Sequence, residues 1–115
     1  MPDSMPSAGF VRVCALGDVR EGEAIAISID DADDSARVLV REGAEVFAVG
    51  RICPHRGGDL SEGVTSNGVL WCPVHSSGFD LRTGAALHPP ASSPLLVYAV
   101  QVHDGDVYVS LRREP

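Results

Sequence analysis

Short runs of alternating apolar and polar residues recur along this chain, separated by clusters of Gly, Asp, Ser and Pro. Each run has the length of a β-strand, and alternation is the pattern of a strand with one buried face. The segment Leu16–Glu23 is short and broken by glycines, so it predicts a turn rather than a helix. The chain is therefore predicted to be all-β, an antiparallel sandwich or barrel. The predicted strands are Phe10–Leu16, Ala24–Ile29, Arg37–Arg41, Glu45–Val49, Val69–Cys72, Gly78–Leu81, Leu96–Val102 and Val107–Leu111.

Length and composition predict one globular domain. A chain of 115 residues, 44% hydrophobic and 22% charged, has room for one core and one functional site. No apolar run approaches the roughly 20 residues that a membrane helix requires. The first residues, MPDSMPSAGF, lack the basic and apolar regions of a secretory signal. We therefore expect a cytoplasmic protein.

The formal charge of −7 argues against binding to nucleic acid phosphates. An acidic surface suits docking onto a basic patch of a partner protein, and it equally suits plain solubility. We interpret the densest acidic run as a solvated hairpin tip, formed by Asp30, Asp31, Asp33 and Asp34.

Two segments that follow predicted strands are rich in Cys, His, Pro and Gly: CPHRGG at 53–58 and CPVHSSG at 72–78. Their spacing is C-x-H, sixteen residues, then C-x-x-H. Three cysteines cannot all pair, and a cytoplasmic chain is not expected to keep disulfides, so cysteines beside histidines indicate a metal site. One thiolate and one imidazole from each loop fit a [2Fe–2S] cluster of the Rieske type, with both cysteines on one iron and both histidines on the other. The candidate ligands are Cys53, His55, Cys72 and His75.

This ligand set has an electrostatic consequence. Two neutral imidazoles in place of two thiolates leave the oxidised centre formally neutral, which raises its potential. Gly57, Gly58 and Gly78 allow the backbone to approach the cluster sulfurs. The proline-rich run at 88–94 is a candidate third loop that covers the cluster.

The same donors also suit tetrahedral zinc, although zinc sites usually pair like ligands and here each loop mixes the two. The remaining noteworthy side chains receive structural interpretations. These are Cys14 as a buried thiol, Trp71 as core packing, His103 as a surface histidine, His88 as a turn residue beside the proline-rich loop, and Arg56 as either a docking or a solvated residue.

The segments CPHRGGDLSEG, CPVHSSGFDLRTG and PPASSPL, in this order, resemble the Rieske ferredoxins of multicomponent bacterial oxygenases. The resemblance runs from about Phe10 to Leu111 and implies a single Rieske [2Fe–2S] domain over residues 1–115. It implies two antiparallel sheets and a small cluster-binding subdomain of loops. It also places Cys53 and Cys72 on the buried iron, and His55 and His75 on the exposed one.

By this resemblance the chain is a one-electron carrier, without catalysis of its own, between a flavoprotein ferredoxin reductase and a terminal oxygenase. Two alternatives stay open: the small subunit of an NAD(P)H-dependent nitrite reductase, and a zinc-stabilised interaction module. An oxygenase catalytic subunit also needs a mononuclear iron site, for which only His88 and His103 would remain.

Compared with high-potential Rieske proteins, this chain has Gly58 and Val74 where those proteins form a disulfide, and Phe79 where they place a tyrosine. Ser77 matches a serine that donates to a bridging sulfide in those proteins. The missing disulfide and phenol predict a low-potential centre.

Overall fold

The computed structural model describes residues 8–29, 36–53, 58–73, 77–87 and 94–112. All strand pairs between named strands are antiparallel, and they form sheets of three, four and three strands. Across these ranges the only helical elements are two short 3-10 turns, η2 (Leu16–Asp18) and η3 (Leu60–Glu62), and no helix is long and apolar enough to cross a membrane. The prediction of an all-β antiparallel fold is confirmed.

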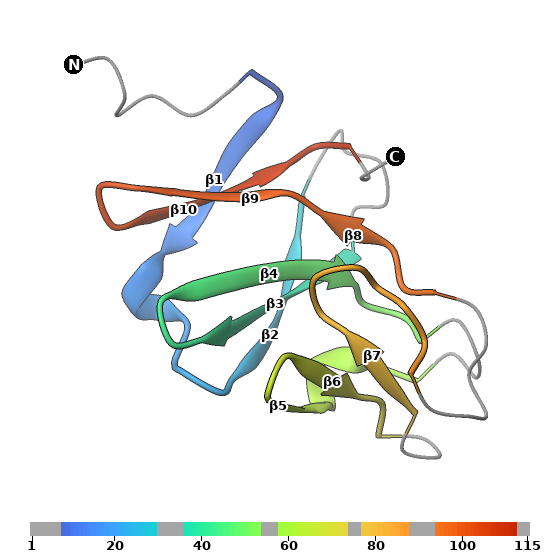
Figure 1. Ribbon diagram of the computed structural model, residues 1–115. Helices are drawn as coiled ribbons and strands as arrows, with labels where there is room; N and C mark the ends of the chain where they lie inside the picture. Colours follow the sequence, from blue (N-terminus) through green and yellow to red (C-terminus); the bar gives the residue numbers. More distant parts are fainter. Residues whose placement is uncertain (1–7, 30–35, 54–57, 74–76, 88–93, 113–115) are drawn as a thin grey trace.

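A four-stranded sheet occupies the middle of the molecule, with the strand order β2-β3-β4-β8 (Figure 1). Its strands are β2 (Ala24–Ser28), β3 (Ala36–Glu42), β4 (Glu45–Gly50) and β8 (Val97–Tyr98). The central strand β3 is buried on both faces, since Val38 and Val40 belong to one core cluster and Leu39 to another. Successive side chains of the apolar run Val38-Leu39-Val40 therefore point into two different interiors.

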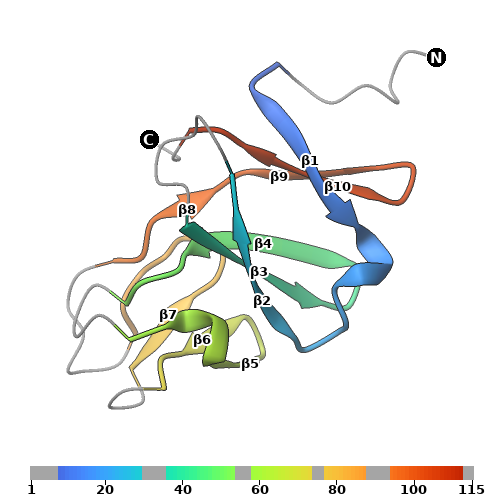
Figure 2. The ribbon, with the colours of Figure 1, turned by 180° about the vertical axis from the view of Figure 1, so that it is seen from behind.

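The second sheet has the order β1-β10-β9 and packs on one face of the first (Figure 2). Its strands are β1 (Phe10–Ala15), β10 (Asp106–Ser110) and β9 (Val100–His103). The predicted strand Leu96–Val102 is in fact divided, because the chain passes from β8 in one sheet to β9 in the other at Ala99. A single alternating run does not show where a strand changes sheets.

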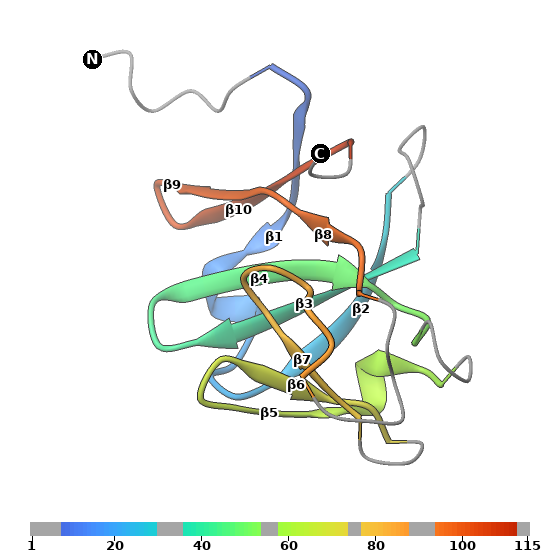
Figure 3. The ribbon, with the colours of Figure 1, turned by 45° about the vertical axis from the view of Figure 1, so that its right-hand side comes forward.

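The third sheet, β5-β6-β7, lies on the opposite face of the four-stranded sheet (Figure 3). It consists of β5 (Val64–Ser66), β6 (Val69–Trp71) and β7 (Gly78–Asp80). β5 was not among the predicted strands. Its signal was the turn Asn67-Gly68, whose φ angles of 52° and 79° are those of a tight hairpin.

Two clusters of buried side chains fill the spaces between the three sheets. One lies between the four-stranded sheet and β1-β10-β9, and includes Leu39, Tyr98 and Val107. The other lies toward β5-β6-β7 and contains both candidate cysteine ligands. Its members are Val38, Val40, Val49, Cys53, Leu60, Leu70, Cys72, Phe79, Leu81 and Leu95.

Candidate metal centre

The two predicted cysteine ligands lie in the same buried cluster, although nineteen positions separate them, from 53 to 72. Cys53 and Cys72 are each only 2% exposed. The predicted histidine ligands His55 and His75 lie outside the described residues. The structure therefore brings together the two thiols, and the described residues alone contain no group of three potential ligands.

The first ligand loop begins at Cys53 and is closed by backbone contacts. The Cys53 N–H donates to the Gly58 carbonyl at 2.8 Å, and the Leu60 N–H donates to the Arg51 carbonyl at 2.8 Å. These bonds flank an isolated antiparallel bridge between Ile52 and Asp59. The two limbs of the loop thus lie side by side up to the cysteine itself.

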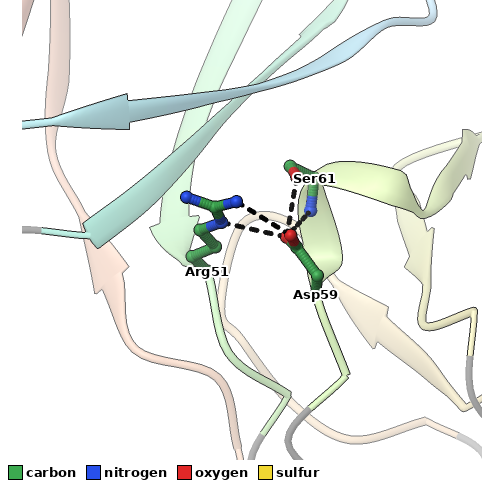
Figure 4. A network of polar contacts seen from close by, with 3 residues as sticks. All are labelled: Arg51, Asp59 and Ser61. Carbon is green, nitrogen blue, oxygen red and sulfur yellow. Dashed lines mark hydrogen bonds and ion pairs between the residues drawn. The ribbon is translucent and has the colours of Figure 1, made fainter.

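A side-chain network crosses the base of this loop (Figure 4). Arg51 donates from Nε to Asp59 Oδ1 at 3.0 Å and from Nη2 to Oδ2 at 2.9 Å. Ser61 donates its backbone N–H at 3.0 Å and its hydroxyl at 2.6 Å to the same Oδ1, so Asp59 also caps η3.

The hydrogen bonds from Arg51, and then those from Ser61, hold the pKa of the Asp59 carboxyl well below its usual range. Asp59 is therefore charged at neutral pH. A depressed pKa stabilises the fold above the ordinary carboxyl range of about 4, and this stabilisation is lost as the pH falls through that range toward the lowered pKa.

The second ligand loop begins at Cys72 and closes in the same way. The Cys72 N–H donates to the Ser77 carbonyl at 2.7 Å, so each cysteine bonds to the carbonyl five positions later, 53 to 58 and 72 to 77. Here the limbs are β6 and β7, and Trp71 lies opposite Gly78. Two loops of equal span therefore start from cysteines that lie in the same group of buried side chains.

Ser77 provides a test of whether these residues fit a cluster. Its side chain is fully buried, and its Oγ has no hydrogen-bond partner among the described residues. An unsatisfied buried hydroxyl costs about 1–3 kcal/mol. An acceptor such as a cluster sulfur next to the second loop would satisfy this donor, so the site fits a [2Fe–2S] cluster.

The predicted third loop, 88–94, lies outside the described residues except for Pro94, but its flanks are placed. The Leu87 N–H donates to the Gly78 carbonyl at 2.8 Å, which ties one flank to the second ligand loop. The Gly50 N–H donates to the Leu96 carbonyl at 2.9 Å, which ties the other flank to β4, the strand before the first ligand loop. Both flanks are thus anchored beside the cysteines.

A second ion pair lies beyond the second loop. Arg82 donates to both carboxylate oxygens of Glu45 at 2.8 and 2.6 Å, and its guanidinium lies 5.3 Å from the ring centre of Phe47. The hydrogen bond from Arg82 lowers the pKa of Glu45. This pair joins the segment after β7 to the first residue of β4.

The burial of the other side chains singled out from the sequence agrees with their predicted roles only in part. Cys14 is half-buried rather than buried, because a register shift between Arg12 and Cys14 interrupts the alternation of β1. Burial, followed by the charge of Asp18, raises the pKa of its thiol. His103 is half-buried and lies edge-on to Tyr108, with ring centres 5.9 Å apart. Trp71 is half-buried, while Arg56, Val74, His88 and the acidic run at 30–34 lie outside the described residues.

Sequence reasoning missed the network of Arg51, Asp59 and Ser61. Arg51 and Asp59 are eight positions apart and belong to no regular element, so no periodicity pairs them. The available signal was Asp59 before Leu60-Ser61, since Asp is a preferred N-cap residue.

Comparisons with known proteins identify the family of this chain. A family model described as the Rieske [2Fe–2S] domain matches residues 9–104. The ferredoxin subunit of 3-phenylpropionate/cinnamic acid dioxygenase from Escherichia coli K12 is 37% identical over 103 residues, which cover 88% of this chain and 92% of the relative.

Several solved structures are also similar to this chain. A chain in the complex of reduced oxygenase and oxidised ferredoxin of carbazole 1,9a-dioxygenase superposes with a TM-score of 0.85 at 29% identity, covering 95% of this chain and 99% of that one. The NADH-dependent nitrite reductase small subunit assigned in Mycobacterium tuberculosis superposes with a TM-score of 0.74 at 25% identity, covering 88% and 93%.

Proposed function

This chain belongs to the Rieske [2Fe–2S] domain family, and on that premise we propose that it is the ferredoxin component of a ring-hydroxylating dioxygenase system. It carries single electrons to a terminal oxygenase. The observation that carries this proposal is the match to a dioxygenase ferredoxin subunit at 37% identity over 92% of that relative. We propose that residues 1–115 form one domain with this role.

The proposed ligands are Cys53 and Cys72 for one iron, and His55 and His75 for the other. The burial of both cysteines supports the first assignment, because a site closed to water keeps thiolates from exchange and oxidation. When bound, the cluster accepts one electron at a time and releases it again. The family match favours this cofactor over the zinc site that the Cys and His spacing alone left open.

The chain's own residues prepare the site for electron transfer without large motion. Both ligand loops are closed at their bases by backbone hydrogen bonds, and the cysteines are packed in the hydrophobic core. A rigid site changes little between its oxidised and reduced forms, so little energy is spent on rearrangement.

The proposed partners are a flavoprotein reductase as donor and the terminal oxygenase as acceptor, in the cytoplasm. The net charge of −7 suits a partner surface that carries a basic patch. Apolar side chains flank the loop segments and are exposed, with Ile52 at 57%, Leu87 at 45% and Leu96 at 40%. Exposed apolar groups of this kind support contact with another protein at this end of the molecule.

The direct test is the cofactor content and redox behaviour of the purified protein. We expect two irons and two acid-labile sulfides per chain, visible absorption that bleaches on one-electron reduction, and a midpoint in the lower part of the Rieske range of about −150 to +300 mV. A colourless protein that contains zinc would contradict the proposed function. A midpoint near the upper limit would contradict only the low-potential assignment, which the buried Phe79 supports because it lacks a hydroxyl donor.

The small subunit of a nitrite reductase is the second candidate, favoured by the structural similarity to such a subunit. The two functions separate by acceptor. The dioxygenase ferredoxin reduces a terminal oxygenase and is expected to elute alone in gel filtration. A nitrite reductase subunit is expected to form a stable complex with its large sirohaem subunit. Neighbouring genes for one or the other acceptor would discriminate in the same way.

Removing the Ser77 hydroxyl tests whether it faces the cluster. We expect Ser77→Ala to lower the midpoint by about 40 mV, because a hydrogen bond that is stronger in the reduced state by about 1 kcal/mol favours reduction. Ser66→Ala, on the exposed side of β5, is the control and should leave the midpoint unchanged. Equal midpoints in the wild type and Ser77→Ala would show that this hydroxyl does not contact the cluster.

A further inference from the structure

The two ligand loops have equal backbone closures, but they stand on different supports. The second loop is held by β6 and β7, which pair at three successive positions within a three-stranded sheet. Among the described residues, the limbs of the first loop share one isolated bridge, between Ile52 and Asp59, and the two backbone hydrogen bonds that flank it, all outside any named strand. Its limbs therefore lack the continuous ladder of backbone hydrogen bonds that holds the second loop.

The network of Arg51, Asp59 and Ser61 lies where that ladder is missing. Arg51 is on the limb that enters the first loop, two positions before Cys53, and Asp59 is on the limb that leaves it. The two side chains form a bidentate ion pair, and Ser61 donates two further hydrogen bonds to Asp59. The network thus links the two limbs directly below the cysteine.

We propose that Arg51 and Asp59 are positioning residues that keep the first ligand loop closed and thereby retain the cluster. This inference rests on the proposed function, because it requires the first loop to bind iron. An exposed ion pair normally contributes little. This one has the bidentate geometry that strengthens a charge-assisted pair, and its side chains are only 39% and 32% exposed.

The consequence concerns how the cluster is lost. Cys53 is 2% exposed, so an alkylating reagent reaches its sulfur, and a chelator reaches the iron that it would hold, only when the limbs separate. Local opening of this kind is governed by the contacts that hold the segment, independently of global unfolding. Weakening the ion pair therefore raises the fraction of molecules in which Cys53 is accessible, while Cys72 stays held by its sheet.

The test is the rate at which the holoprotein loses its visible absorption in excess iron chelator. We expect Asp59→Asn to lose the cluster about tenfold faster than the wild type, the effect of removing a partly buried charge-assisted pair that holds a local opening closed. Arg51→Gln should behave similarly. The double variant should be no more than about twofold faster than Asp59→Asn, because residues that act through one interaction are not additive.

Glu45→Gln is the matched control. It breaks the other bidentate pair, between Glu45 and Arg82, which follows the sheet-supported second loop. We expect its rate of cluster loss to stay within about twofold of the wild type, since the ladder of β6 and β7 remains. The same loss in thermal stability for Glu45→Gln and Asp59→Asn, with different rates of cluster release, would separate positioning from general destabilisation.

Alkylation of the holoprotein, followed by mass spectrometry, gives a readout specific to the loop. In Asp59→Asn the initial rate of modification should rise at Cys53 and not at Cys72. If Asp59→Asn does not assemble a cluster, Ser61→Ala replaces it as a milder variant, with about threefold faster release from the loss of one hydrogen bond to the carboxylate.

Unchanged release in Asp59→Asn, or equal acceleration in Glu45→Gln, would overturn the positioning role and leave the proposed function intact. A wild-type protein without iron and sulfide would contradict the proposed function itself. The two failures are thus told apart by the cofactor content of the starting material.

Discussion

Serine in place of Cys53 or Cys72 is expected to abolish cluster binding. Each cysteine begins one ligand loop and lies in the buried cluster between two sheets, with 2% exposure. A [2Fe–2S] cluster is held by thiolates, and the hydroxyl of serine is a much poorer ligand at neutral pH because it keeps its proton. Iron and acid-labile sulfide per chain, together with visible absorption, measure this loss.

Cys14→Ser is the control for this experiment. Cys14 lies on β1 and packs against the other core cluster, on the far side of the four-stranded sheet. We expect the variant to retain the full complement of iron and sulfide. A Cys14→Ser protein without cluster, or a Cys53→Ser protein with a complete one, would contradict the ligand assignment.

The second large effect is expected from Gly84→Ala, which tests how the chain after β7 packs beside the cysteines. Gly84 has φ +80°, and a Cβ at this position would lie 2.3 Å from the Leu95 carbonyl oxygen and 2.8 Å from Val97 Cγ2. Leu95 belongs to the buried cluster that contains Cys53 and Cys72, and its N–H donates to the Gly84 carbonyl at 2.8 Å. The backbone of this segment therefore has to move to admit a methyl group.

We expect Gly84→Ala to lower the free energy of unfolding by about 3 kcal/mol, the sum of about 1 kcal/mol for positive φ and about 2 kcal/mol for overpacking. Gly105→Ala separates the two contributions. Gly105 also has φ +80°, but nothing lies within 4 Å of its Cβ position, so only the cost of positive φ, about 1 kcal/mol, applies there.

Urea unfolding followed by circular dichroism measures both variants under the same conditions. Similar losses for the two would show that the segment around Leu95 adapts without cost, and that close packing beside Gly84 does not stabilise the fold.

The sequence predicts most of this fold because short apolar runs, bounded by turn residues, mark the strands that the core buries. The runs at 24–29, 37–41 and 45–49 became β2, β3 and β4 with small changes at their ends. β5 was missed because Val64 is its one apolar residue, so the segment Val64–Ser66 shows no alternation. The division of the predicted strand Leu96–Val102 at Ala99 was missed because both parts alternate equally well.

The candidate site was predictable where chemistry restricts the choice of residue and unpredictable where geometry alone decides. Cysteines and histidines at metal-binding spacing identify a site from the order of the residues alone. The ion pair of Arg51 and Asp59 depends on two limbs that meet only after folding. The unsatisfied hydroxyl of Ser77 likewise becomes visible only when its surroundings are placed.

The four-stranded sheet has a consequence for how this protein tolerates change. Val38 and Val40 belong to the core that contains the cysteines, and Leu39 belongs to the other core. Neighbouring residues of β3 are therefore constrained by different surroundings. Leu39 and Val107 only pack the core of the scaffold, so other apolar side chains of similar total volume can replace them. Substitutions at Val40 and Phe79 disturb the buried core in which Cys53 and Cys72 are packed. One half of the interior is thus open to redesign for stability, while the other half preserves the redox centre.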